Sequence, residues 1–176
     1  MSPSGYEFDH VAETIGTKIV RDAFWRENRC NWLGAQSIQR LGRDAGTGMA
    51  YQTLGPDLYS GTSGVALFLA ELAAVTGDSA TRNTAVAAIR QALSRSEDVP
   101  PAARLGLFSG WLGIVLAAVR ISLILDSPEI RSETLLLLRR CRDERIDTEE
   151  FDLMTGNAGA IGALLVLEHM LEDSSL

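Results

Sequence analysis

Three stretches of the chain follow one pattern, and this repetition constrains the fold more than any other feature. Each has two apolar residues, a Ser or Thr, a Gly, two further residues, a second Gly, and then a long apolar run. The first glycines lie 49 and then 46 residues apart. A period of this length predicts that one supersecondary unit recurs and stacks on its neighbours. The glycine pairs are Gly61 and Gly64, Gly110 and Gly113, and Gly156 and Gly159.

The sequence after the first glycine pair predicts a helical hairpin. An apolar helix continues from Gly64 to about position 75, and residues 76–78 (Thr-Gly-Asp) are typical of a helix stop and turn. Apolar residues at helical spacing predict an amphipathic helix over 79–95. Two prolines in 96–101 indicate a connecting loop. Each unit therefore combines one apolar helix with one amphipathic helix.

The second copy has the same plan. Its apolar helix extends to about Leu125, a turn follows at 126–128, and a second helix is expected over about 129–142. Pro128 suits the first helical turn because its missing N–H would have no partner there in any case. The third copy supplies a third apolar helix after Gly159. We therefore predict an all-α fold.

The difference between the two helices of a hairpin predicts two layers. Apolar helices must be covered on most sides, so they should form an inner layer, and the amphipathic helices should form an outer layer with a charged face in water. Glycines at the start of each inner helix would let the chain turn and let neighbouring backbones approach. The helix N-termini would then converge on one face and favour an anionic or electron-rich group.

The first third of the chain is less regular. Apolar residues at helical spacing predict a helix over 9–25, which should break at 27–29. A Gly-rich loop is expected over 42–48. We interpret residues 1–176 as a single domain, with an N-terminal helix and loop in 1–50 and the helical-hairpin repeats in 51–176.

Charge and composition exclude some classes of function. The net charge is −7, which argues against nucleic acid as a partner because an acidic surface repels phosphates. The longest apolar runs, 113–125 and 158–167, are too short to span a membrane. Residues 1–10 lack the apolar core of a signal peptide. Cys30 and Cys141 form no paired motif and fit a reducing compartment, so we expect a cytoplasmic protein.

These motifs resemble those of the lanthionine synthetase C-like (LanC-like) family. Residues 54–70 (LGPDLYSGTSGVALFLA) are similar to its first repeat motif, 108–113 (FSGWLG) to the second and 151–160 (FDLMTGNAGA) to the third. Residues 29–34 (RCNWLG) resemble the stretch that precedes the first repeat. The resemblance covers nearly the whole chain, in the order and at the spacing of the family's N-terminal repeats.

The resemblance implies an α/α toroid of seven helical hairpins and an activity in lanthipeptide biosynthesis. The peptide-modifying members are zinc enzymes that add a cysteine thiol of a precursor peptide to a dehydrated Ser or Thr, which closes a thioether ring. Zinc lowers the pKa of the thiol so that the thiolate is present at neutral pH. A precursor peptide is the partner that this implies.

The family's catalytic aspartate precedes the third motif, and Asp152 occupies that place. Asp152 is therefore the candidate catalytic residue, although its carboxylate could also accept hydrogen bonds from nearby backbone N–H groups. The family's zinc ligands lie in later Cys-x-Gly and Cys-His-Gly motifs that this sequence does not contain. We assign no metal ligand to Cys30, Cys141, His10 or His169, and expect no zinc in this chain.

Other motif residues have two interpretations. Tyr59 and Phe108 either pack the turns or line the cavity, and Asp57 either caps its loop or steers it. Trp111 is expected to pack in the core rather than face the cavity mouth, and Trp32 is expected to anchor the N-terminal segment. The six motif glycines, Gly61, Gly64, Gly110, Gly113, Gly156 and Gly159, are expected at the cavity end of the inner helices.

Two classes of function follow, and the sequence leaves both open. In the first, the chain is part of a thioether-forming cyclase, an incomplete ring of about three hairpins that is inactive without the zinc-binding repeats. In the second, it is a non-catalytic toroid fragment that binds a peptide or a protein. A carbohydrate-active toroid is less favoured, because only Asp152 is well placed among the acidic residues such sites need. In both main classes, a C-terminal half or a second copy is expected to cover the open helical face.

Overall fold

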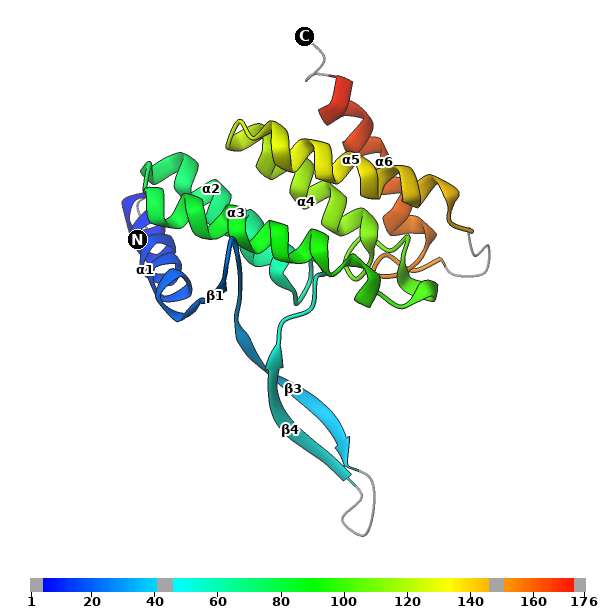
Figure 1. The fold of residues 1–176 in the computed structure, drawn as a ribbon, viewed down its shortest axis with the longest axis horizontal. Helices are drawn as coiled ribbons and strands as arrows, with labels where there is room; N and C mark the ends of the chain where they lie inside the picture. Colours follow the sequence, from blue (N-terminus) through cyan, green and yellow to red (C-terminus); the bar gives the residue numbers. More distant parts are fainter. Residues whose placement is uncertain (1–4, 41–45, 146–150, 173–176) are drawn as a thin grey trace.

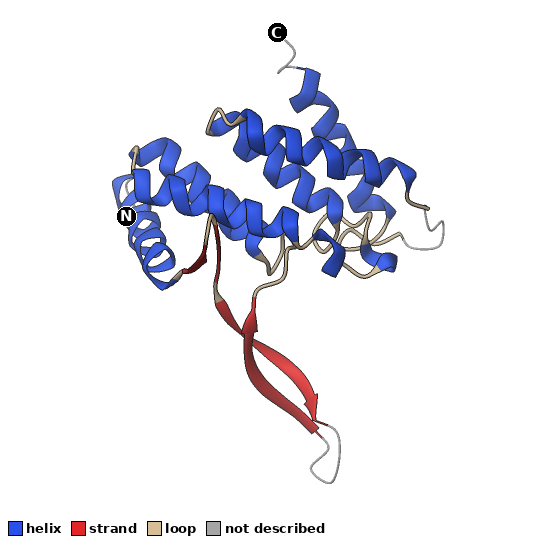
Figure 2. Ribbon diagram, viewed as in Figure 1, coloured by secondary structure: helices blue, strands red, loops and turns tan. Residues whose placement is uncertain are grey.

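A computed structural model describes residues 5–40, 46–145 and 151–172 of the chain. Helices dominate the described part, and the strands are confined to its first third (Figure 2). Two short 3₁₀ helices, η1 (Ser96–Asp98) and η2 (Pro101–Ala103), lie in the connection after the first hairpin. The α-helices are α1 (Gly5–Asp22), α2 (Thr62–Thr76), α3 (Ser79–Ser94), α4 (Trp111–Ile124), α5 (Pro128–Asp143) and α6 (Asn157–Glu172).

The helices after the first glycine motif form two layers, which confirms the predicted all-α helical-hairpin fold. The apolar helices α2, α4 and α6 pack side by side in sequence order. The amphipathic helices α3 and α5 cover α2 and α4, respectively (Figure 1). The described helices form two complete hairpins and the inner helix of a third. These helices do not by themselves close a ring, so the closed toroid stays a prediction.

The central helix α4 shows why the apolar runs fold as inner helices. Ten of its residues are buried, and they point in all directions around the helix axis. In α3, by contrast, one side is buried, with Ala85, Ala88, Ile89 and Ala92 inaccessible to solvent. The core of the protein therefore lies between the two layers, and its small alanines allow α3 to approach α2 closely.

The turn between α2 and α3 has the chemistry that the sequence predicts. Gly77 has φ of 70°, a left-handed conformation that favours glycine, and its N–H donates to the carbonyl of Ala73. Asp78 is the N-cap of α3, and its carboxylate accepts hydrogen bonds from the N–H and the hydroxyl of Thr81. These bonds lower the pKa of Asp78. Pro128 is the first residue of α5, as expected.

This cap predicts a measurable dependence of stability on pH. Because the pKa of Asp78 is lower in the folded state, its contribution is complete above the unfolded value of about 3.9 and is lost as pH falls through the folded value. We expect Asp78→Ala to lower the melting temperature by a few degrees at pH 7. Asp78→Asn should keep the cap but remove this part of the acid sensitivity. Thermal melts of the wild type and both variants between pH 2 and 7 check this; parallel curves would contradict it.

The N-terminal third differs from the prediction. Helix α1 ends at Asp22, and Phe24–Arg26 (β1) pairs with Arg29–Asn31 (β2). Residues Leu33–Arg40 (β3) and Gly46–Thr53 (β4) form an antiparallel hairpin, the arm, which projects from the helical body (Figure 1). The predicted loop over 42–48 is therefore wrong for residues 46–48, while 42–45 lie outside the described residues. Strand β4 also crosses the division that we placed after residue 50.

Trp32 anchors the N-terminal segment, as predicted. Its ring is buried, and its indole N–H donates to the carbonyl of Ile19 in α1 at 2.7 Å. Next to it, the side chain of Asn31 donates to the carbonyl of Leu54 and accepts from the N–H of the same residue. These contacts fix α1 and the base of the arm to the start of the repeats. No helix in 5–40, 46–145 and 151–172 is both long enough and apolar enough to cross a bilayer.

Candidate functional site

The loops that precede α2, α4 and α6 lie next to one another and are joined by backbone hydrogen bonds. The N–H groups of Leu58 and Tyr59 in the first loop donate to the carbonyl of Phe108 in the second, at 3.1 and 3.0 Å. The N–H of Phe108 donates to the carbonyl of Met154 in the third, at 3.0 Å. Tyr59, Phe108 and Met154 hold the same position in the repeated pattern. We call this row of hydrogen bonds the loop ladder.

The second glycine of each motif is required by this arrangement. A Cβ atom on Gly113 would overlap the carbonyl oxygen of Leu107 in its own loop and would lie 3.0 Å from Cβ of Leu58 in the preceding loop. Gly159 has the same relation to Leu153 and Leu107. Each motif loop therefore folds back onto the first turn of its own helix, and the start of the second and third helices is in close contact with the loop before.

The first glycine of each motif is close to other backbone atoms of its loop. Gly61 and Gly110 are the N-caps of α2 and α4 and have φ near −110°, which any residue can adopt. Glycine is needed there for space, because a Cβ on Gly61 would lie 2.5 Å from the carbonyl oxygen of Gly55. Gly156 directly precedes α6 and is buried. The structure thus places all six motif glycines at the same end of the inner helices.

The residues along the loop ladder have apolar and hydroxyl side chains, most of which are exposed. Tyr59 is largely exposed, Phe108 is partly buried, and Met154 is exposed. A hydroxyl residue follows each of them, namely Ser60, Ser109 and Thr155. We call the surface formed by these six residues the motif-loop face. Such a surface offers apolar contacts and hydroxyl oxygens to a ligand.

Asp152 holds its own loop. Its carboxylate accepts hydrogen bonds from the N–H groups of Met154 and Thr155, at 2.6 and 2.9 Å, and from the hydroxyl of Thr155 at 2.7 Å. These bonds lower the pKa of Asp152, so the exposed carboxylate is ionised at neutral pH. It lies beside the motif-loop face, where it could also meet a ligand.

The equivalent residue of the first loop, Asp57, also holds its own loop. Its carboxylate accepts hydrogen bonds from the N–H and the hydroxyl of Ser60. The second loop has Gly106 at this position, and a Cβ there would lie 2.9 Å from Cα of Thr155. The middle loop has no space for a carboxylate, because the third loop packs against it.

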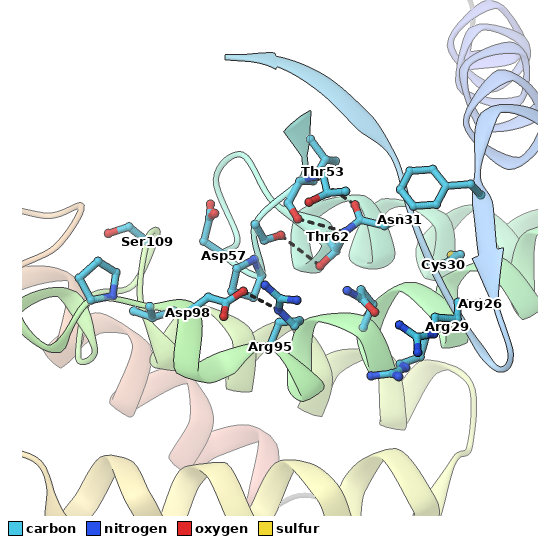
Figure 3. Close-up of a pocket in the computed structure, with 17 residues that line it drawn as sticks. Arg26, Arg29, Cys30, Asn31, Thr53, Asp57, Thr62, Arg95, Asp98 and Ser109 are labelled. Atoms are coloured by element: carbon cyan, nitrogen blue, oxygen red, sulfur yellow. Dashed lines mark hydrogen bonds and ion pairs between the residues drawn. The ribbon is translucent and has the colours of Figure 1, made fainter. Parts of the chain in front are cut away.

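A cavity of about 410 Å³ opens behind the first two motif loops (Figure 3). Its walls come from β1 and β2, from the end of α3, and from the loop before α2. Arg26 and Arg29 lie at one end of this cavity and Asp57 and Ser109 toward the other, while Arg95 forms an ion pair with Asp98 between them. Both signs of charge are therefore present next to the motif-loop face.

Comparison with known proteins agrees with this repeat pattern. The sequence profile of a family described as lanthionine synthetase C-like protein matches residues 52–175, which include all three motifs. The chain belongs to the lanthionine synthetase C-like family. A comparison with curated proteins finds no match. The three motifs within the matched residues form the loops that the loop ladder joins.

The zinc ion of LanC-like cyclases does not fit the residues that this chain provides. Among the described residues, no three His, Cys, Asp or Glu side chains lie close enough together to hold a metal ion. Burial raises the pKa of the Cys30 thiol to about 12 and that of Cys141 to about 11. Thiols of this kind are poor sources of the thiolate that binds zinc. We derive no chemical step through zinc.

The two buried thiols give a simple test of the packing in this LanC-like chain. At pH 8 only a very small fraction of either thiol is ionised, and both side chains are buried. We expect neither Cys30 nor Cys141 to react with Ellman's reagent in the native protein within minutes, and both to react after unfolding in guanidinium chloride. Rapid reaction of the native protein would contradict the burial of these thiols.

Sequence reasoning missed a cluster around Trp111, which packs in the core as predicted. The Arg104 and Arg140 guanidinium carbons lie 4.5 and 4.4 Å from the centroid of its ring. Both arginines pair with Glu97, and Arg104 also pairs with Glu144 at 2.6 Å. The indole N–H donates to the carbonyl of Ser96. No local pattern signals this cluster, because Arg140 belongs to α5, 29 residues after Trp111.

Proposed function

We propose that the chain supplies a peptide-binding part of a lanthionine synthetase-like cyclase that acts on dehydrated precursor peptides. The observation that supports the proposal is the loop ladder, because its backbone hydrogen bonds bring the exposed residues Tyr59 and Met154 next to the half-buried Phe108. An extended peptide that contains a dehydrated Ser or Thr and a Cys would lie across this row. Apolar contacts would hold it, and the hydroxyl oxygens beside them, whose protons are donated within the loops, would accept hydrogen bonds from its backbone N–H groups.

The reaction itself needs groups that the described residues do not bring together. Thioether formation joins a cysteine thiolate to the β-carbon of a dehydrated residue, and the resulting enolate takes up a proton at the α-carbon. Asp152 stays our candidate for the proton transfer because it is exposed beside the motif-loop face. Since no zinc ligands gather there, we propose that the chain forms no thioether unless another polypeptide segment provides them.

A non-catalytic role is the second candidate, and it is favoured because no three potential metal ligands gather among the described residues. With both of its own cysteines buried, this part of the chain can also bind a dehydrated peptide without adding a thiol to it. The free, buried state of the two thiols also supports the cytoplasmic location that we propose, because no disulfide stabilises the fold.

A binding experiment tests the peptide-binding proposal. A fluorescent peptide with one dehydroalanine and one cysteine is titrated with the chain, and anisotropy gives the dissociation constant. We expect Tyr59→Ala to weaken binding about tenfold, as removal of an exposed aromatic anchor does. Tyr51→Ala is the matched control, because Tyr51 lies on the arm and is exposed to a similar extent, 77% against 72% for Tyr59. Equal effects of the two variants, or no binding, would contradict the proposal.

The same peptide tests whether the chain alone can form a thioether. Mass spectrometry after iodoacetamide treatment counts the peptide's free thiol, which is lost when a thioether forms. The chain incubated with zinc and the peptide should leave that thiol free at the uncatalysed rate. Faster loss, caused by this chain alone, would show that it needs no further ligands and would overturn our account of the missing zinc site.

A further inference from the structure

Two arginines lie directly opposite each other in the small hairpin of β1 and β2. The register pairs Arg26 with Arg29, so both side chains leave the same face of the hairpin, with their Cβ atoms about 5 Å apart. Like charges at directly opposite positions destabilise a pair of strands. The described residues give neither guanidinium group an ion pair or a side-chain hydrogen bond. An arrangement that costs stability and has no compensating contact within the fold points to a binding role.

Both arginines line the cavity of about 410 Å³ behind the first two motif loops, which we call the arginine cavity (Figure 3). Its volume is within the range typical of ligand pockets, about 300–1,000 Å³. Arg29 is half-buried at one end of this cavity, and Arg26 is exposed beside it. Glu27, in the turn between the two arginines, is exposed and does not line the cavity.

The fold leaves these two positive charges unpaired although carboxylates are in excess. The chain has 23 acidic and 16 basic residues. The two acidic residues that line the arginine cavity already have partners, since Asp98 pairs with Arg95 and Asp57 holds its own loop. The two unpaired arginines can therefore bind an anion from outside the fold. Their planar guanidinium groups suit a carboxylate, which can accept two parallel N–H···O bonds from each.

The position of the arginine cavity indicates a peptide as the source of that carboxylate. Ser109 lines the cavity and also belongs to the motif-loop face, so the two sites adjoin each other there. A peptide that lies across the motif-loop face can continue past Ser109 into the cavity and reach its arginine end. A nucleic acid is disfavoured, because its row of phosphates would come next to Asp57 and Asp98.

We propose that the arginine cavity binds an Asp or Glu side chain of the peptide that lies on the motif-loop face, with Arg26 and Arg29 holding its carboxylate. This inference rests on the proposed function and deepens it, because the substrate must then carry an acidic residue near its dehydrated segment. In the free protein the two arginines repel each other, and the bound carboxylate offsets that repulsion.

Two matched peptides test the proposal. Both contain the dehydroalanine and cysteine segment of the first probe, and a three-residue extension is either Glu-Gly-Glu or Gln-Gly-Gln. One pair of peptides carries the extension at the N-terminus and a second pair at the C-terminus. Anisotropy titration with the full chain should give, for one of the two pairs, about fivefold tighter binding of the acidic peptide. A variant with Arg26→Gln and Arg29→Gln should lose this preference and bind the neutral peptide as before.

A second double variant is the matched control for the arginine cavity. Arg139→Gln with Arg142→Gln removes the same charge from exposed positions of α5 that do not line the cavity, so it should keep the preference for the acidic peptide. The variant with Arg26→Gln and Arg29→Gln should melt at no lower temperature than the wild type, since it removes two opposed like charges. A clearly lower melting temperature would mean that these arginines stabilise the fold, which contradicts the proposal.

The extension alone separates this inference from the proposed function. Acetylated Glu-Gly-Glu without the dehydrated segment should displace the acidic probe at higher concentration, and Gln-Gly-Gln should not. If this holds while the dehydrated segment adds no affinity, the proposed function fails and the arginine cavity stands. Equal affinity for the acidic and neutral probes, or the same loss of preference in both double variants, would overturn the proposal. So would displacement of the acidic probe by millimolar inorganic phosphate at constant ionic strength, because the cavity would then be a site for small anions.

Discussion

Replacing Gly113 by alanine is expected to lower the free energy of unfolding by about 3 kcal/mol, at the upper end for an added methyl group in a packed core. The new Cβ would overlap the carbonyl oxygen of Leu107, which belongs to the backbone and cannot rotate away. It would also press on Leu58 of the preceding loop, so the loop ladder must shift. Urea unfolding followed by circular dichroism measures the change.

Gly162→Ala is the matched control for this substitution. Gly162 lies inside α6, and an added Cβ would have no atom within 4 Å. Because alanine is the better helix former by about 1 kcal/mol, we expect this variant to be more stable than the wild type. Gly159→Ala, three residues earlier in the same helix, should instead destabilise the protein. Similar effects of Gly159→Ala and Gly162→Ala would contradict the account of the motif glycines.

Trp111→Ala should have an effect of comparable or larger size, about 3–5 kcal/mol of lost stability. Trp111 begins α4, and its ring is buried against α5 and the connection after α3. Removal of the ring leaves a large cavity. It also leaves Arg104 and Arg140 without the aromatic surface on which both guanidinium groups lie. The indole hydrogen bond to Ser96 would be lost as well.

Trp25→Ala provides the comparison for Trp111→Ala. Trp25 lies on β1 and is about half exposed, so its removal should change the free energy of unfolding by at most about 0.5 kcal/mol. Both variants can be measured by the same urea titration, followed by circular dichroism rather than tryptophan fluorescence. A small effect of Trp111→Ala would show that the cluster around its ring contributes little to the fold.

The helical part of this structure could be predicted from the sequence because two independent signals agree there. Helical periodicity separates apolar from amphipathic helices, and Gly77, Asp78 and Pro128 mark their ends with residues whose backbone chemistry is specific. Helices α3 and α5 accordingly begin within one residue of the predicted positions. The recurring glycines then order the hairpins, and the family assignment rests on the same residues.

The arm could not be predicted in the same way. Strands β3 and β4 pair only with each other, and neither packs on a helix. Leu33, Met49 and Tyr51 lie on one face of the hairpin and remain exposed. Because these apolar side chains are exposed, this face of the arm does not need the alternation of apolar and polar residues by which strands are recognised.

The candidate site was predicted in part. The motif residues were identified, but the hydrogen bonds between Tyr59, Phe108 and Met154 use backbone groups, which leave no trace in residue type. Asp152 shows a further limit. The sequence allowed both a loop-holding and a catalytic role, and the structure gives its carboxylate three hydrogen bonds within its own loop. Its catalytic role stays a prediction.

Hydrogen–deuterium exchange of single amides, followed by NMR, tests the loop ladder most directly. If the three glycine-begun helices align their loops, the N–H groups of Leu58, Tyr59 and Phe108 should exchange far more slowly than in an unfolded peptide. Gly113→Ala should accelerate all three together. Exchange of these amides at the unfolded rate in the native protein would contradict the alignment of the motif loops, and with it the peptide-binding surface that we propose.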